Sequence, residues 1–412
     1  MTSSLPQLPE VALLQNDDSM LSRRFGKEIT NYYAGGSINR ISFLRADTSF
    51  LQQASKSPRA RYFALNNLGP VVEDQSTLAL FSLESLKSLI GSDPFKLSED
   101  ESIKNFDSTK KTPLIVFLGL HEGPNSDEFT TTSHGTVKGE PYFAVDVTPR
   151  GTYSEAASVF LKSQEEKGFT VQKNARAMTL HAEAAAMYAQ ARSMVDWNTR
   201  NGFCAGCGNP NLSVHAGYKR VCPPTDLKGA QEAVTFDDCP TRHGVSNVCF
   251  PRTDPTMIAA IVSADGQRVL LGRQTRYPPH LYSTLAGFLE PGESFEECVR
   301  REVWEEAGVK VGRVVVHSTQ PWPYPSSLMI GAIGQAVAGG ETIELNDKEL
   351  EVAKWFPIEE VRQALLSGAG ALDAPPPPGY KEGELRVPPP QAIANRLLTA
   401  VAEGYLTTAP KI

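Results

Sequence analysis

The chain has 412 residues, more than one hydrophobic core usually supports, so its length predicts two or three domains. Apolar residues make up 41% of the chain and charged residues 21%, a balance that is typical of soluble globular proteins and argues against wholesale disorder. The formal net charge of -7 argues against a broad basic surface for nucleic acid, but it is compatible with a small anionic substrate held by metal ions.

The N-terminal stretch, residues 1–28, is predicted to be flexible. Within it, the segment from Met1 to Asp18 lacks the basic flank and the apolar core of a signal peptide. Nowhere does an apolar run approach the ~20 residues that a membrane-spanning helix needs. We therefore expect a soluble, cytoplasmic protein that has no membrane partner.

Residues 29–199 are predicted to form a mixed, mostly β domain, because apolar runs with strand character recur along them. These runs are Arg61–Leu65, Leu78–Leu83, Leu114–Leu118 and Tyr142–Val147. The stretch from Ala175 to Val195 is rich in Ala, Met and Gln and holds no Gly or Pro, so it indicates one long helix. No internal repeat is evident in the sequence.

A cysteine cluster follows, in residues 200–250. Cys204 and Cys207 form a tight C-x-x-C knuckle, and Cys222 and Cys239 come after 14 and 16 intervening residues. Tetrahedral Zn²⁺ favours four thiolates supplied by two such elements. We therefore predict a structural zinc site made by these four cysteines.

The second pair of cysteines is spread over an insertion, which departs from the usual second C-x-x-C and leaves alternatives open. Three other side chains could replace one of the four ligands: His215, His243 and Cys249. A redox disulfide is a further alternative, although no thioredoxin-like βαβ pattern surrounds the knuckle. Cys298 lies far from the cluster in sequence and is expected to be a small buried hydrophobe.

Residues 251–366 alternate short apolar runs with one strong helical segment near Arg300. The runs are Met257–Val262, Val269–Leu271, Val314–Val316 and Leu328–Ile333. Strands that bracket a helix in this way predict an α+β or α/β sandwich. The chain as a whole is therefore expected to belong to the α+β class.

The helix in this domain is well signalled at both ends. Ser294 can cap its N-terminus while Glu297 closes a reciprocal capping box, and Gly308 suits a left-handed stop. Apolar residues recur at every fourth position and predict a stripe that faces the core. The residues of this stripe are Phe295, Val299, Val303 and Ala307.

Three glutamates share the other side of the same helix. Glu302, Glu305 and Glu306 stand at i, i+3 and i+4, where like charges repel. Hard cations such as Mg²⁺ or Mn²⁺ prefer oxygen ligands and are shared with substrate phosphates, so a divalent ion would relieve this repulsion. Alternatively, Arg301 pairs internally with Glu297 or Glu305, or the helix is simply solvated.

The sequence around this helix resembles a known family. Gly287, five residues, Glu293, seven residues, and then the run from Arg301 to Val309 match the Nudix box without a departure. The match resembles the Nudix hydrolases, which implies an α/β/α sandwich and hydrolysis of a nucleoside diphosphate linked to another moiety. Eight or so fixed positions over 23 residues make this a specific signal.

The resemblance also implies roles for individual residues. The catalytic residues that it implies are Glu293, Arg301, Glu302, Glu305 and Glu306. Glu302 and Glu306 would be metal ligands together with the backbone carbonyl of Ala286, and Glu305 would be a further ligand or the base. Two roles stay open for Glu293, which could orient Arg301 or bind metal. Metal ions in such a site lower the pKa of a bound water and align it for in-line attack.

A segment rich in proline and aromatic residues lies about ten residues beyond the helix. Its residues are Thr319, Gln320, Pro321, Trp322, Pro323, Tyr324, Pro325, Ser326 and Ser327. Prolines that alternate with aromatics make a stiff, extended platform, whose alternatives are a recognition ligand or a rigid connector. The segment resembles the S-Q-P-W-P-[FY]-P-x-S signature of NADH pyrophosphatases within the Nudix group, from which only Thr319 departs. The resemblance implies that Gln320 to Ser327 contact the substrate and select a reduced nicotinamide dinucleotide.

Further residues resemble those of the same subfamily. Glu349 is implied as a fourth carboxylate ligand, with a surface turn as the alternative, and Ala394 is implied to line the substrate site. Phe250 and Phe288 correspond to aromatics that sandwich the adenine, one from each subunit of a homodimer, and a flat purine suits such stacking. Either phenylalanine could instead belong to the core.

The end of the chain changes composition. Residues 367–390 are rich in Pro and Gly and predict an extended linker, and residues 391–412 predict a final helix and tail. The last residues, Pro410, Lys411 and Ile412, loosely match the peroxisomal address whose strict form is Ser-Lys-Leu, which makes the peroxisome an alternative location. A frayed tail is the other interpretation.

These resemblances, which extend from about Ile29 to Leu398, imply one leading function. They imply a metal-dependent hydrolase that splits NADH or NAD⁺ into AMP and the nicotinamide mononucleotide, with a structural zinc between two domains. Removal of NAD caps from RNA 5′ ends is a second implied activity, because the scissile bond is the same. The alternatives are a Nudix diphosphatase for ADP-ribose or dinucleoside polyphosphates, and a catalytically silent protein that binds nucleotide or RNA.

Overall fold

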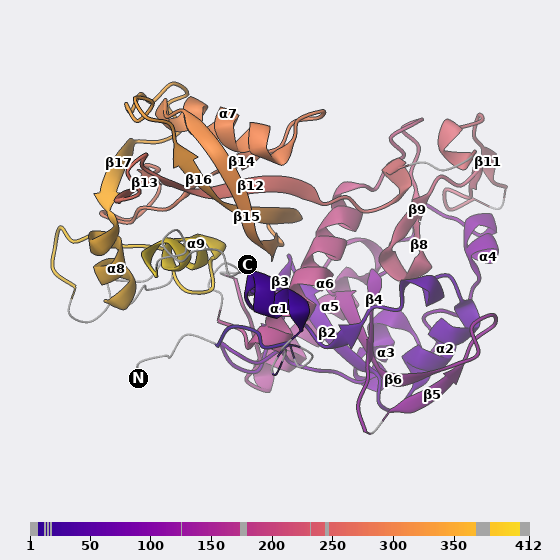
Figure 1. The fold of residues 1–412 in the computed structure, drawn as a ribbon. Helices are drawn as coiled ribbons and strands as arrows, with labels where there is room; N and C mark the ends of the chain where they lie inside the picture. Colours follow the sequence, from indigo (N-terminus) through magenta and orange to yellow (C-terminus); the bar gives the residue numbers. More distant parts are fainter. Residues whose placement is uncertain are drawn as a thin grey trace.

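The computed structural model describes residues 7–11, 14, 16, 19–124, 126–173, 179–230, 232–243, 247–367 and 380–403 (Figure 1). Much of the Pro-rich linker and the tail Pro410–Ile412 lie outside these described residues, so the peroxisomal address stays a prediction. No helix in the described part of the chain combines the length and the apolar character that crossing a bilayer requires.

The N-terminal domain is built on one mixed sheet. Its strands are β1 (Ile38–Asn39), β2 (Arg61–Asn66), β3 (Gly69–Val72), β4 (Ile115–His121), β5 (Asp127–Thr130), β6 (Thr136–Asp146) and β7 (Thr170–Val171). Its helices are α1 (Met20–Phe25), α2 (Thr48–Lys56), α3 (Leu83–Ile90), α4 (Glu99–Lys104), α5 (Ser154–Glu166) and α6 (Ala182–Arg200). One core packs the sheet against α2, α3 and α5, and a second packs the sheet against α6.

Two predictions for this domain need correction. The run Leu78–Leu83 makes only isolated bridges, because Ser82 accepts a hydrogen bond from the Ser85 N–H and begins α3 there. The long helix begins at Ala182, later than predicted, and continues to Arg200.

The C-terminal domain is an α/β/α sandwich, as the resemblance implied. Its strands are β12 (Asp254–Val262), β13 (Arg268–Arg273), β14 (Leu285–Phe288), β15 (Val311–Trp322), β16 (Ser327–Ala336) and β17 (Val352–Pro357). Its helices are α7 (Phe295–Ala307), α8 (Ile358–Leu366) and α9 (Ile393–Ala402). The α7 helix packs on one face of the sheet and α8 and α9 on the other, so the α+β class predicted from the sequence is confirmed.

The two sheets share one topology. The order β4-β6-β2-β3-β7 in the first sheet corresponds to β15-β16-β12-β13-β17 in the second. In each sheet the second and third strands of this order are parallel, and every other neighbouring pair is antiparallel. The fold therefore contains a structural repeat that the sequence does not display.

A small cysteine-rich module joins the two domains in the chain. It holds two hairpins, which pair β8 (Leu212–Val214) with β9 (Lys219–Val221) and β10 (Thr225–Asp226) with β11 (Val234–Thr235). Its core consists of three buried cysteines, Cys204, Cys222 and Cys239. So small a core needs a covalent or metal cross-link for stability.

Candidate active site and metal centre

The α7 helix is capped as its sequence predicts. The side chain of Ser294 accepts a hydrogen bond from the Glu297 N–H, and the Glu297 carboxylate accepts one from the Ser294 N–H. Gly308 ends the helix at a φ of 72°, in the left-handed conformation that favours glycine. Capping at both ends fixes where the helix stops and therefore which side chains point away from the core.

Gly287 on β14 allows Glu302 to lie against the sheet. A methyl group added at Gly287 would overlap the carboxylate of Glu302, so a larger residue there would force that carboxylate to move. Gly287 follows Ala286, which pairs with Ile258 of β12. The structure thus brings the Glu302 carboxylate close to the backbone strand that carries the Ala286 carbonyl.

The substitution Gly287→Ala tests this close approach. We expect a loss of hydrolytic rate on the order of 100-fold, because displacing one carboxylate by about an ångström misplaces whatever it holds. The melting temperature should change little. Gly202→Ala is the control, since an added methyl group there meets no atom within 4 Å. Full activity in Gly287→Ala would contradict the assigned role of Glu302.

Arg301 is the hydrogen-bond centre of the acidic cluster. Its guanidinium donates to both oxygens of Glu293, at 2.7 and 2.8 Å, and to Glu302 and Glu305 at 3.0 Å each. It also donates to the carbonyl of Phe288 at 2.9 Å. Of the two internal partners considered from the sequence, Glu305 is therefore a partner, whereas Glu297 is engaged in the helix cap.

Glu293 is held by Arg301 through a two-bond pairing. Its hydrogen bonds with Arg301 lower the pKa of its carboxyl to about 2. The backbone N–H of Glu290 donates to the same carboxylate at 3.0 Å. Of the two roles left open by the sequence, the structure favours that of orienting Arg301.

Glu306 is the most unusual side chain of the cluster. It is 2% exposed, and its Oε2 atom has no hydrogen-bond partner among the described residues. Burial first, and then the negative charges of Glu349, Glu302, Asp347 and Glu305, raise the pKa of this carboxyl to about 9. A buried carboxylate with unused lone pairs among four other acids is a donor set that fits a divalent cation.

Glu349 lies at the edge of this cluster, on the loop between β16 and β17. Its N–H donates to Asp347 at 2.9 Å, and its carboxylate accepts a hydrogen bond from Gln274 at 3.1 Å. Asp347 and Gln274 have no role predicted from the sequence. Asp347 could have been found from its position two residues before Glu349, whereas Gln274 has no sequence signal.

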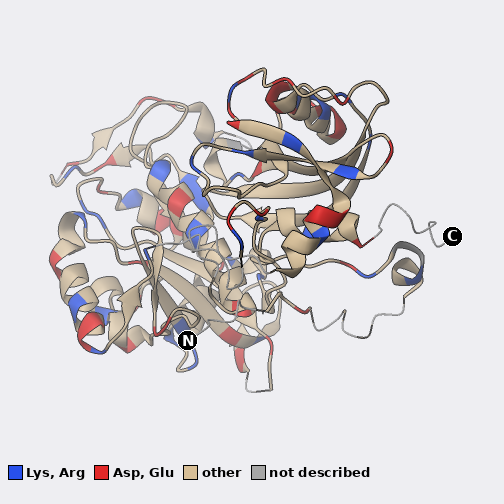
Figure 2. Ribbon diagram, turned by 90° about the vertical axis from the view of Figure 1, so that its left-hand side faces the viewer, with Lys and Arg blue, Asp and Glu red and all other residues tan. Residues whose placement is uncertain are grey.

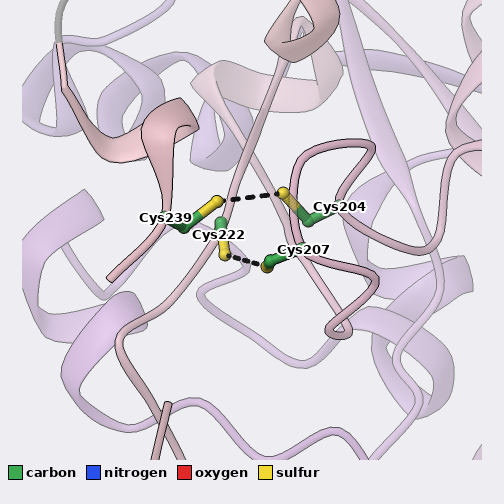
Figure 3. Close-up of side chains that lie close together, drawn as sticks. All are labelled: Cys204, Cys207, Cys222 and Cys239. Carbon is green, nitrogen blue, oxygen red and sulfur yellow. Dashed lines mark hydrogen bonds between the residues drawn. The ribbon is translucent and has the colours of Figure 1, made fainter. Parts of the chain in front are cut away.

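The four cysteines of the module converge (Figure 3). Their sulfur atoms all lie within 4.8 Å of one another, with 3.6 Å between Cys204 and Cys239 and 3.5 Å between Cys207 and Cys222. Tetrahedral zinc with bonds of about 2.3 Å separates its sulfurs by about 3.8 Å, whereas a disulfide needs about 2.05 Å. The donor set therefore fits a closed structural zinc site. Within the described ranges, no other group of His, Cys, Asp or Glu atoms gathers so closely.

The three alternative ligands lie elsewhere. His215 contacts Glu99 at 2.8 Å and His243 contacts Asp238 at 2.7 Å. The Cys249 thiol faces the carbonyl of Thr241 instead of the other sulfurs. These contacts leave the four predicted cysteines as the ligand set.

The aromatic and buried residues assigned to the substrate differ in accessibility. Phe250 is 41% and Phe288 57% exposed, so the alternative that either belongs to the core is wrong. Gln320 is fully buried and Ala394 is 3% exposed, which places both inside the protein in this conformation. Direct contact of Gln320 or Ala394 with a substrate stays a prediction.

The remaining residues of the Pro-rich segment form the end of β15, the β15–β16 turn and the start of β16. They are Pro321, Trp322, Pro323, Tyr324, Pro325, Ser326 and Ser327. Trp322 pairs with Ser327 across the two strands, which closes the hairpin. Trp322 and Tyr324 are partly buried against the core that contains α6, so the segment lies at the boundary of the two domains.

In the ribbon view of Figure 2, Lys and Arg positions are interspersed with Asp and Glu positions along the described chain. This distribution agrees with the net charge of -7. A long anionic partner would therefore be recognised at a local site.

Comparison with family models gives three matches in chain order. Residues 59–197 match an NADH pyrophosphatase-like rudimentary NUDIX domain, residues 199–229 an NADH pyrophosphatase zinc ribbon domain, and residues 253–374 a NUDIX domain. The first and third matches account for the shared strand order of the two sheets. The zinc ribbon match ends before Cys239, so the fourth ligand rests on the geometry described above.

Several curated proteins are similar along most of the chain. The "NAD-capped RNA hydrolase" of Schizosaccharomyces pombe is 34% identical in an alignment of 388 residues that covers 90% of this chain and 93% of that protein. The "NAD-capped RNA hydrolase NUDT12" of Homo sapiens is 33% identical, over 90% of this chain and 73% of its own length. The human mitochondrial "NAD(P)H pyrophosphatase NUDT13" is 34% identical over 55% of this chain and 59% of its own.

Proposed function

Because this chain belongs to the Nudix hydrolase family, in its zinc-ribbon NADH pyrophosphatase subfamily, we propose that it hydrolyses the pyrophosphate bond of NADH and NAD⁺. The products are AMP and the reduced or oxidised nicotinamide mononucleotide. The observation that carries this proposal is the buried carboxylate oxygen of Glu306, which has no hydrogen-bond partner among the described residues and lies among four other acids on and beside the Nudix helix.

The carboxylates of the cluster have different proposed roles, which are metal binding and proton acceptance. Glu302 and Glu306, with the carbonyl of Ala286, would hold the divalent ions, and the oxygen donors favour Mg²⁺ or Mn²⁺. When bound, such ions neutralise the diphosphate and activate a water for attack. Glu305, whose side chain is 38% exposed, is the carboxylate best placed to accept the proton of that water.

Arg301 and Glu293 would keep this arrangement in place. The guanidinium spans Glu293, Glu302 and Glu305, so it fixes three carboxylates of the site against one another. Glu349 would complete the oxygen ligands from the opposite loop. Its electrostatic effect on Glu306 supports this placement.

NAD-capped RNA is a second candidate substrate. It is favoured because the relatives named as NAD-capped RNA hydrolases match 90% of this chain. The bond to be cut is the same as in free NADH. The RNA body would leave the site from the adenosine side, where the exposed Phe250 and Phe288 are proposed to stack on the adenine.

We also propose that the chain forms a homodimer, in which each adenine is sandwiched between one of these phenylalanines from each subunit. Two large apolar side chains exposed on one chain suit an interface that covers them. Sedimentation at several protein concentrations tests this point. A strictly monomeric, fully active enzyme would contradict it.

One assay tests the function. The purified protein is incubated with Mg²⁺ or Mn²⁺ and, separately, with NADH, NAD⁺, ADP-ribose and NAD-capped RNA, and the products are separated by chromatography. We expect AMP from NADH and decapped RNA from the capped substrate. Cleavage of ADP-ribose with no AMP from NADH would overturn the substrate assignment, and binding without any cleavage would support a silent nucleotide-binding protein.

A further inference from the structure

The tip of the β15–β16 hairpin, residues 318–327, is held by the N-terminal domain. In Figure 1 the end of β15 reaches the region of α6, β2 and β3. The rings of Trp322 and Tyr324 pack on the core that also contains Tyr33 and Tyr188. The aromatic part of the signature segment is thus partly buried against the neighbouring domain.

Arg192 on α6 makes the most specific contacts with the tip. Its Nη1 donates to the carbonyl of Pro323 at 2.6 Å, and its guanidinium lies over the ring of Tyr324, 4.6 Å from the centroid. A charge-assisted hydrogen bond to a turn carbonyl, combined with a cation–π contact, fixes both the backbone and the side chain of that turn.

Tyr33 holds the tip from a second side. Its hydroxyl lies 2.9 Å from that of Tyr324, and its ring contacts those of Trp322 and Tyr324 at centroid distances of 6.1 Å each. Trp322 and Tyr324 also contact each other, at 5.2 Å. The two aromatics of the signature therefore form one cluster with a residue of the N-terminal domain.

The strand that leads to the tip is fixed as well. Asn31 donates to Ser318 at 3.1 Å and to the carbonyl of Thr319 at 2.9 Å. The side-chain amide of Gln320 donates to the carbonyl of Tyr32 at 3.0 Å and to that of Gln391 at 2.8 Å. Gln320 also accepts a hydrogen bond from the Ile393 N–H, at the start of α9. These bonds explain why Gln320 has no exposed surface.

The tip is mechanically linked to the carboxylate site. It begins β16, which runs parallel to β12, and β12 pairs with β14 through Ile258 and Ala286. We expect a shift of the tip to be transmitted through these paired strands toward the Ala286 carbonyl. The N-terminal domain itself has no counterpart of the run Arg301–Glu306 in α3 or α4.

We propose that Arg192 and Tyr33 are positioning residues for the dinucleotide site. On this proposal the N-terminal domain, which repeats the sheet topology of the C-terminal domain, sets the affinity for the dinucleotide by holding the hairpin tip. The proposal rests on the proposed hydrolysis of NADH and gives the N-terminal domain a role in that reaction.

The test compares steady-state kinetics on NADH for four full-length proteins: wild type, Arg192→Ala, Arg192→Lys and Tyr33→Phe. For Arg192→Ala we expect the KM to rise about 10-fold or more with kcat within about threefold of wild type, because loss of the charge-assisted hydrogen bond lowers the population of the docked tip that binds substrate. Arg192→Lys keeps a donor and a cation and should recover part of the affinity. Tyr33→Phe, which loses only the hydroxyl, should raise the KM by about threefold or more.

Arg200→Ala is the matched control on the same helix. Arg200 pairs with Asp196 at the far end of α6 and its side chain is 55% exposed, so its KM and kcat should equal those of wild type. The proposal is overturned if the KM of Arg192→Ala stays within twofold of wild type, or if kcat falls while the KM is unchanged. If Arg192→Ala does not fold, Tyr33→Phe decides by the same criterion. A wild type that leaves NADH uncut would instead refute the proposed function.

Discussion

Glu306→Gln is expected to lower kcat on NADH by on the order of 10³-fold or more while the fold stays intact. Glutamine matches glutamate in shape but cannot supply an anionic oxygen to a cation, and Glu306 is the most deeply buried carboxylate of the cluster. Turnover is measured with Mg²⁺ and with Mn²⁺, and circular dichroism checks the fold. Retained turnover in the variant would refute the assignment of Glu306 as a ligand.

When no divalent ion is bound, Glu306→Gln should also make the protein more stable, by an amount that depends on pH. The folded-state pKa of Glu306 is raised to about 9, so ionising it costs stability as the pH rises from about 4.5 through about 9. Glutamine removes this cost. In urea unfolding without Mg²⁺ or Mn²⁺, the variant should therefore exceed wild type in stability at pH 8 and match it near pH 4. A variant less stable than wild type at pH 8 would contradict the burial argument.

The second large effect is expected from Cys204→Ser. Loss of one thiolate from a closed four-ligand site should release about one equivalent of zinc. The module then keeps only a three-cysteine core, and the melting temperature should fall by roughly 10 °C. Metal analysis of the purified protein and a thermal melt measure the two effects.

Cys249→Ser is the matched control, since Cys249 is a buried free cysteine of the same segment that lies outside the cluster. It should retain its zinc. If Cys249→Ser loses the metal while Cys204→Ser keeps it, the ligand set is wrong.

The predictions that succeeded rest on short, local patterns. The capping box of Ser294 and Glu297 and the stop at Gly308 depend on neighbours within one helix, so the sequence alone determined them. The convergence of the four cysteines depends on longer loops, but the knuckle Cys204–Cys207 and the preference of zinc for thiolates restricted the choice.

What escaped prediction depends on contacts between distant residues. Gln320 was predicted to contact the substrate, yet its side-chain amide donates to the backbone carbonyl of Tyr32, 288 residues away in sequence. No local pattern in the sequence predicts such a partner. The strand order common to the two sheets was missed for the same reason. Strand pairing joins distant residues, and here it leaves no visible repeat in the sequence. For Arg301 the sequence offered Glu297 or Glu305 as internal partners and Glu293 as a residue that could orient it, and the guanidinium bridges Glu293, Glu302 and Glu305.

The docking of the hairpin tip limits how the molecule can be divided. A fragment that starts at residue 251 would keep the whole carboxylate cluster, yet it would present Trp322 and Tyr324 to water as an uncovered aromatic surface. We expect such a fragment to self-associate, because association would remove from water the two rings that Tyr33 and α6 normally cover. The C-terminal domain thus depends on the N-terminal domain for the apolar cover of these two rings, and we expect that replacing both by polar residues would help to separate the two domains.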